Sequence, residues 1–179
     1  LLSRKKIREH TRGWSLDKIE VPRWREYRTD YFLVRTDGLL SDIRVVSFYL
    51  EAYRKILVEN LKGDAGDDPF SVHLFRDTKA YRRYAESKGR SGSEAFYDSD
   101  RGEIVSGFPM KNGWGRFLSI LMHEYVHQYI ARAYGKKVPP WLEEGVADYF
   151  GALTFDRAEV RAGSEIPRYQ KLIDLHFRG

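Results

Sequence analysis

The segment from Arg116 to Tyr134 constrains the fold most, because it is apolar on most sides and yet carries three ionisable side chains. Its apolar residues recur at helical spacing: Leu118, Leu121, Met122, Tyr125, Val126 and Tyr129. A helix that is apolar all round is buried, so His123, Glu124 and His127 are expected in the interior, where an unpaired ionisable group is costly. The sequence therefore predicts a central helix, ended by Gly135, whose polar side chains have partners.

The pattern HEYVH at residues 123–127 predicts a metal site. His123 and His127 are one helical turn apart and project from the same face. Two imidazoles so placed can bind one zinc ion, which prefers nitrogen ligands in tetrahedral geometry. Glu124 is offset around the helix by about 100°, which places it beside the metal, where it can take a proton from metal-bound water. The alternative is a helix with incidental histidines, because this pattern alone is weakly specific.

A catalytic zinc usually has three protein ligands, and the segment PPWLEEGVADYF at residues 139–150 can supply the third. The chain has no cysteine, which excludes thiolate ligands. Glu143 and Glu144 lie on the next predicted helix, and sixteen residues separate His127 from Glu144. That length is enough to end one helix and pack the next against it. The alternative is an acidic first turn that complements the helix dipole, which accounts for one of the two glutamates.

Asp148 lies one turn after Glu144 and is a candidate partner for His123. A histidine that binds a metal commonly donates its other ring N–H to a carboxylate. Three small residues on the same helix would let the two helices approach closely: Gly145, Ala147 and Gly151.

Elsewhere the sequence alternates between predicted strands and helices. We expect strands at 30–37 and 70–75, helices at 39–61, 77–89 and 141–153, a hairpin at 94–108, and a last helix starting near residues 164–167. Asp77 is a candidate N-cap and Pro140 suits the first turn of its helix. The order predicts an α+β fold: a small mixed sheet with an edge hairpin, an active-site helix and a helical C-terminal part.

The chain has 179 residues and a net charge of +5, which fits one domain at residues 29–179 after a basic N-terminal segment at 1–28. Trp14, Trp24 and Tyr27 are the expected anchors of that segment. The basic run at 4–12 is interpreted as a solvated tail, since no nucleic-acid-binding motif accompanies it. No apolar run reaches the length of a membrane span. The chain begins with Leu rather than Met, so a removed export signal stays open, and we lean to an exported bacterial protein.

The phrases HEYVH and WLEEGVADYF together resemble the gluzincins, zinc peptidases of the MA clan whose third ligand is a glutamate on the helix after the histidine helix. In that family pattern the second glutamate is the ligand, which implies Glu144 rather than Glu143. The resemblance also implies that Asp148 supports a ligand. These motifs cover about residues 118–150. The region 27–105 looks like the N-terminal half of a poorly characterised bacterial group of gluzincin-like proteins.

The resemblance implies further features of a zincin-like peptidase. A strand before the active helix would form the upper edge of the cleft, and residues 102–108 stand in that place, although they also fit an ordinary hairpin strand. A substrate peptide would add to that edge by main-chain pairing. The family also places a Tyr or His beyond the third ligand to stabilise the oxyanion. The candidates are Tyr149, Tyr169 and His176, none of which stands in a matching motif.

The sequence thus predicts a zinc metallopeptidase that hydrolyses peptide bonds of a peptide or protein substrate, with metal-activated water and Glu124 as general base. Two rival hypotheses remain. One is a vestigial zinc-binding scaffold that binds a partner without cleaving it. The other is a basic nucleic-acid-binding protein with incidental histidines.

Overall fold

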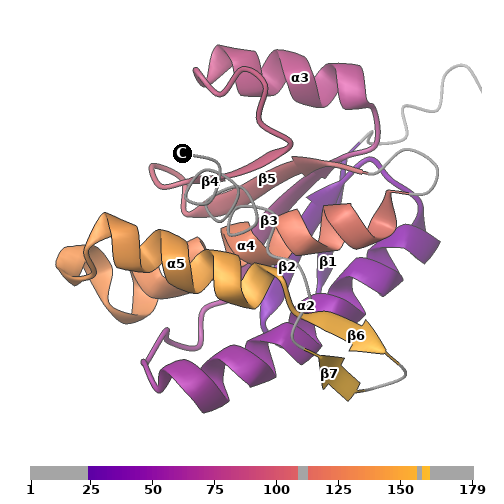
Figure 1. Cartoon of the computed structure of the whole chain (residues 1–179). Helices are drawn as coiled ribbons and strands as arrows, with labels where there is room; N and C mark the ends of the chain where they lie inside the picture. The colour runs from indigo at the N-terminus through magenta and orange to yellow at the C-terminus, as the bar shows by residue number, and fades with distance from the viewer. Residues whose placement is uncertain (1–23, 109–112, 157–158, 162–179) are drawn as a thin grey trace, which may run out of the picture.

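The computed structural model describes residues 24–108, 113–156 and 159–161, which contain a five-stranded sheet, a two-stranded hairpin and four α-helices (Figure 1). In chain order the elements are β1 (Arg25–Arg28), β2 (Phe32–Thr36), α2 (Leu40–Leu61), β3 (Phe70–Phe75), α3 (Thr78–Ser87), β4 (Ala95–Asp98), β5 (Glu103–Gly107), α4 (Trp114–Ala133), the 3-10 helix η2 (Gly135–Lys137), α5 (Pro140–Gly151), β6 (Thr154–Asp156) and β7 (Glu159–Arg161). The predicted mixture of sheet and helices is confirmed.

The main sheet has the strand order β1-β2-β3-β5-β4. Its three central strands are parallel, while β1 and β4 pair antiparallel at the two edges. The predicted mixed sheet with an edge hairpin is therefore confirmed. Of the two interpretations of residues 102–108, the ordinary hairpin strand is confirmed and the cleft edge is wrong, because β5 pairs with β3 on one side and with β4 on the other. The edge strand of this hairpin is β4.

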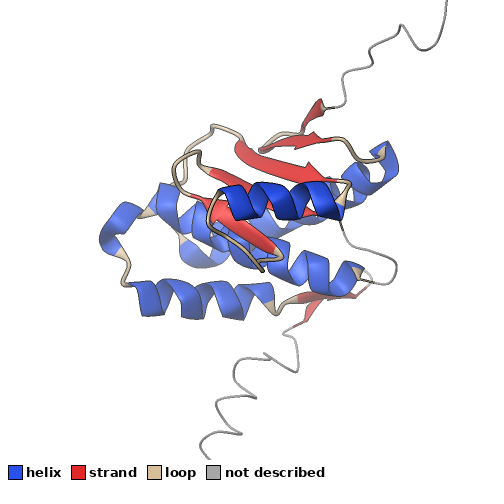
Figure 2. Cartoon of the chain, turned by 90° about the horizontal axis from the view of Figure 1, so that it is seen from above, coloured by secondary structure: helices blue, strands red, loops and turns tan. Residues whose placement is uncertain are grey.

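Helices cover both faces of the sheet: α2 and α4 lie on one side and α3 on the other (Figure 2). Alternation along β3 explains this division, because successive side chains of a strand point to opposite faces. Phe70, Val72 and Leu74 belong to the larger core, which α2 and α4 share. Phe75 joins the smaller core against Tyr81 of α3.

The central helix α4 is buried as predicted. The rings of Tyr125 and Tyr129 are fully buried and contact Phe70 of β3. The buried Gln128 side chain donates hydrogen bonds to the carbonyl oxygens of Ser71 and Gly102, at 3.2 and 2.6 Å. One amide thus fixes α4 to β3 and to the turn between β4 and β5, which sets the position of the histidines.

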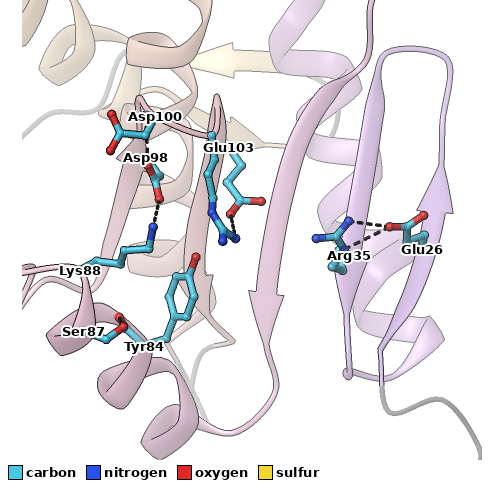
Figure 3. A network of polar contacts seen from close by, with 9 residues as sticks. Glu26, Arg35, Tyr84, Ser87, Lys88, Asp98, Asp100 and Glu103 are labelled. Carbon is cyan, nitrogen blue, oxygen red and sulfur yellow. Dashed lines mark hydrogen bonds and ion pairs between the residues drawn. The ribbon is translucent and has the colours of Figure 1, made fainter.

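The other face of the sheet carries a polar network (Figure 3). It contains three ion pairs: Lys88–Asp98 at 3.0 Å, Arg101–Glu103 at 3.5 Å and Arg35–Glu26 at 2.8 Å.

Beside this network His73 is buried against the rings of Trp24 and Phe75, which confirms Trp24 as an anchor. Burial, with smaller contributions from the charges of Arg35 and Arg101, lowers the pKa of His73 from 6.5 to about 4. The folded protein therefore holds this imidazole neutral.

Two features of the fold were not predicted. Residues 25–28 form β1, although the sequence REYR shows no apolar alternation, and residues 154–161 contribute the β6–β7 hairpin. Trp14 and the helix predicted near residues 164–167 lie outside the described residues. In the part of the chain that the structure describes, no helix combines the length and the apolarity needed to cross a bilayer.

Candidate metal centre

Helix α5 packs closely against α4 and contributes three carboxylates to the site, those of Glu143, Glu144 and Asp148. Pro140 occupies the first turn, as predicted. At the other end Gly151 lies so close to α4 that a Cβ atom would come within 3.1 Å of both His123 Cβ and the Ser119 carbonyl oxygen. The Ser119 hydroxyl donates a 2.7 Å hydrogen bond to the Gly151 carbonyl. Gly145 was also predicted to allow this approach, which is wrong, because a Cβ atom there would contact nothing within 4 Å.

The packing of the two helices brings the three predicted ligands together. The Nε2 atoms of His123 and His127 are 3.1 Å apart, and the Glu144 carboxylate oxygens lie 3.6 and 3.7 Å from them. All the candidate ligand atoms lie within 4.8 Å of one another. Ligands at zinc–nitrogen distances in a tetrahedron would be about 3.3 Å apart. Two imidazoles and one carboxylate at this spacing fit a zinc ion.

Each histidine has a carboxylate at its other ring nitrogen. His123 Nδ1 lies 3.2 Å from Asp148, as predicted, and His127 Nδ1 lies 2.8 Å from Glu143. An Nδ1–H that donates to a carboxylate leaves Nε2 with its lone pair, the tautomer that binds a metal. Both Nε2 atoms face Glu144, so the carboxylates orient both rings toward one point.

The role of Glu143 was missed from the sequence, where one of the two glutamates was interpreted as a residue that complements the helix dipole. Glu143 does stand in the first turn of α5. Its side chain also contacts the second histidine. The signal in the sequence is that each ligating histidine needs its own acceptor, and whichever of Glu143 and Glu144 does not bind the metal can serve His127.

Glu124 lies between the ligand group and the edge strand β4. Its Oε2 accepts a 2.9 Å hydrogen bond from the backbone N–H of Tyr97, a contact that sequence reasoning did not predict. Burial raises the pKa of Glu124 and the nearby Glu144 adds to the increase, while His127 and the Tyr97 N–H oppose it. The carboxylate is thus held in a sheltered place with a pKa above its ordinary value.

Of the three predicted oxyanion residues, the structure describes only Tyr149. Tyr149 is 55% exposed and its ring contacts Phe150, while Tyr169 and His176 lie outside the described residues. Comparisons with protein-family models, with curated proteins and with solved structures each found no match.

Proposed function

We propose that this protein is a zinc-dependent peptidase with a zincin-like fold of the gluzincin type. The observation that carries the proposal is the convergence of His123, His127 and Glu144, with a carboxylate behind each histidine. Three ligands and an open fourth position are typical of catalytic zinc, whereas structural sites use four protein ligands. The half-exposed side chain of Glu144, at 52%, supports an open position on the solvent side.

The side chains of the site have separate roles in this proposal. When bound, a zinc ion supplies Lewis acidity toward a carbonyl oxygen and lowers the pKa of water to about 7. His123, His127 and Glu144 hold the ion. Glu124 takes a proton as water adds to the peptide carbonyl carbon, and delivers that proton to the leaving nitrogen as the C–N bond breaks. Its Oε2 is held by Tyr97, which leaves Oε1 for the proton.

The edge strand β4 supports a peptide as the substrate. Its outer side is not paired to another strand of the described sheet, and an extended peptide can add to such an edge by main-chain hydrogen bonds. Tyr97 N–H points from this edge to Glu124. A peptide paired along β4 would therefore run past the general base.

A second candidate function is a scaffold that binds zinc and a partner without cleavage. It is favoured by one observation: the ring of Tyr149, the one predicted oxyanion residue in the described part of the chain, contacts Phe150.

The variant Glu124→Gln separates the two functions. In a peptidase it should keep zinc and lose about 10²–10⁴-fold in turnover, the usual contribution of a general base. The matched control is Glu59→Gln on the exposed side of α2, which should behave as wild type. Zinc content and cleavage of a broad peptide library are measured on the same samples. Full cleavage by the Glu124 variant would refute the mechanism, and a zinc-loaded wild type without any cleavage would favour the scaffold.

A further inference from the structure

A cavity of about 560 Å³ lies between α3, the loop before β4, the end of β5 and the first turns of α4. Its volume is within the range of about 300–1,000 Å³ found for small-ligand sites. Aromatic and aliphatic side chains form much of its lining: Tyr81, Ala85, Phe108, Phe117 and Ile120.

Helix α4 and the segment that enters β4 each contribute residues both to the metal centre and to this cavity. Ile120 in its wall precedes Glu124 by one turn of α4, on the same helix face, a rise of about 6 Å. Glu94 at its rim precedes Tyr97 by three residues, about 10 Å of extended chain. The carboxylates of Glu124 and Glu94 also help burial to raise the pKa of Tyr81, whose ring lines the cavity. A peptide lying along β4 with its reactive bond at Glu124 would therefore extend over the cavity.

Several polar groups around the cavity bond to one another, while the charged side chains of Arg82 and Glu86, which also line it, are exposed. Arg116 Nε lies 3.0 Å from each carboxylate oxygen of Glu94, and the same guanidinium contacts Glu94 again through NH2. The Tyr81 hydroxyl donates to the Ser93 carbonyl at 3.0 Å, and the Ser106 hydroxyl donates to the Glu94 carbonyl at 3.1 Å. Arg116 and Glu94 therefore neutralise each other, and rings and aliphatic groups form much of the remaining lining. Such a lining favours an uncharged, apolar occupant.

We propose that this cavity binds one large uncharged apolar side chain of the peptide substrate, of leucine to phenylalanine size, within about three residues of the cleaved bond. The inference rests on the proposed peptidase function and specifies its substrate class. The cavity would select substrates by the side chain it holds, while the metal centre acts on the backbone.

The first test fills the cavity. Ser93→Trp puts an indole at its wall and Thr78→Trp does so from the start of α3. Ser87→Trp places the same ring on the exposed side of α3, outside the cavity, and is the matched control. For zinc-loaded wild type, we expect library cleavage products to show Leu, Met or Phe enriched at one position near the cut. The filled variants should lose about tenfold or more in kcat/KM for such peptides and little for peptides with Ala there, at unchanged zinc content.

The second test needs no turnover. Binding of two blocked dipeptides, acetyl-Phe-Leu-amide and acetyl-Ala-Ala-amide, is measured by NMR titration of each zinc-loaded protein. The Phe-Leu probe should bind wild type and the Ser87 variant about tenfold or more tighter than the Ala-Ala probe, and the Ser93 variant should lose that difference. Cleavage without apolar preference, or equal binding of the two probes to wild type, would overturn the cavity assignment and leave the peptidase function standing. Selective binding with no cleavage by any zinc-loaded sample would defeat the peptidase function alone.

Discussion

The two glycines of α5 provide a matched pair that tests how closely α4 and α5 are packed. Alanine in place of a helical glycine stabilises a helix by about 0.5–1 kcal/mol. At Gly145 the new methyl group meets no atom within 4 Å, so Gly145→Ala should show this gain in full. At Gly151 it meets His123 Cβ and the Ser119 carbonyl at 3.1 Å, which is tighter than ordinary contact.

Overpacking of this kind costs about 1–3 kcal/mol. Gly151→Ala should therefore be neutral to about 2.5 kcal/mol less stable than wild type, after the helical gain is subtracted. The expected gap between the two variants is about 1–3 kcal/mol, or roughly 2–4 °C in Tm for each kcal/mol in a chain of this size. Because the new contact presses on His123 itself, the shift of α5 should also displace Asp148 and Glu144 and weaken zinc binding.

Urea unfolding with a chelator present measures stability without the contribution of bound metal. A competition titration against a zinc indicator measures affinity separately. We expect Gly145→Ala to bind zinc as wild type and Gly151→Ala to bind it about tenfold more weakly or worse, as for disturbed partners of ligands. Equal gains in stability and equal zinc affinities for the two variants would refute the close packing on which the site depends.

Three further predictions follow from individual contacts. In the same competition titration, Glu143→Gln should weaken zinc binding by about 10–100-fold, and Glu144→Ala should weaken it more. If the Glu143 variant binds zinc as tightly as wild type, Glu143 does not support His127 as a ligand. Gln128→Ala should lower the free energy of unfolding by about 1–3 kcal/mol in urea, since two buried carbonyls lose their donor. The pKa of His73 is lowered from 6.5 to about 4 in the folded protein. The contribution of His73 to the free energy of unfolding should therefore be fully present above pH 6.5 and be lost as the pH falls toward 4. His73→Phe should make that decline in stability shallower, and an unchanged slope would contradict it.

The parts of the site that the sequence predicted depend on local spacing. His123, His127 and Asp148 were found because helical periodicity alone places residues one turn apart on the same face, and the choice of Glu144 over Glu143 came from a motif. The sequence could not indicate that Gly151 is the residue of close approach. Small residues permit two helices to pack closely, but the sequence does not specify which small residue lies at the contact. Gly145 on the same helix faces open space.

The parts that were missed depend on pairings between distant segments. A hairpin pattern at 94–108 does not indicate which of its strands joins β3, so the sequence left open whether residues 102–108 form the edge. The contact between Tyr97 and Glu124 exists only once β4 lies beside α4. Strand β1 likewise has no pattern of its own and is defined by its register with β2.

X-ray diffraction at the zinc absorption edge, from crystals of zinc-saturated protein, tests the central claim most directly. The account predicts one anomalous peak within bonding distance of His123 Nε2, His127 Nε2 and the Glu144 carboxylate, with Glu124 beside the metal and not bonded to it. An absent peak at this position, or a peak bound by a different set of side chains, would contradict it.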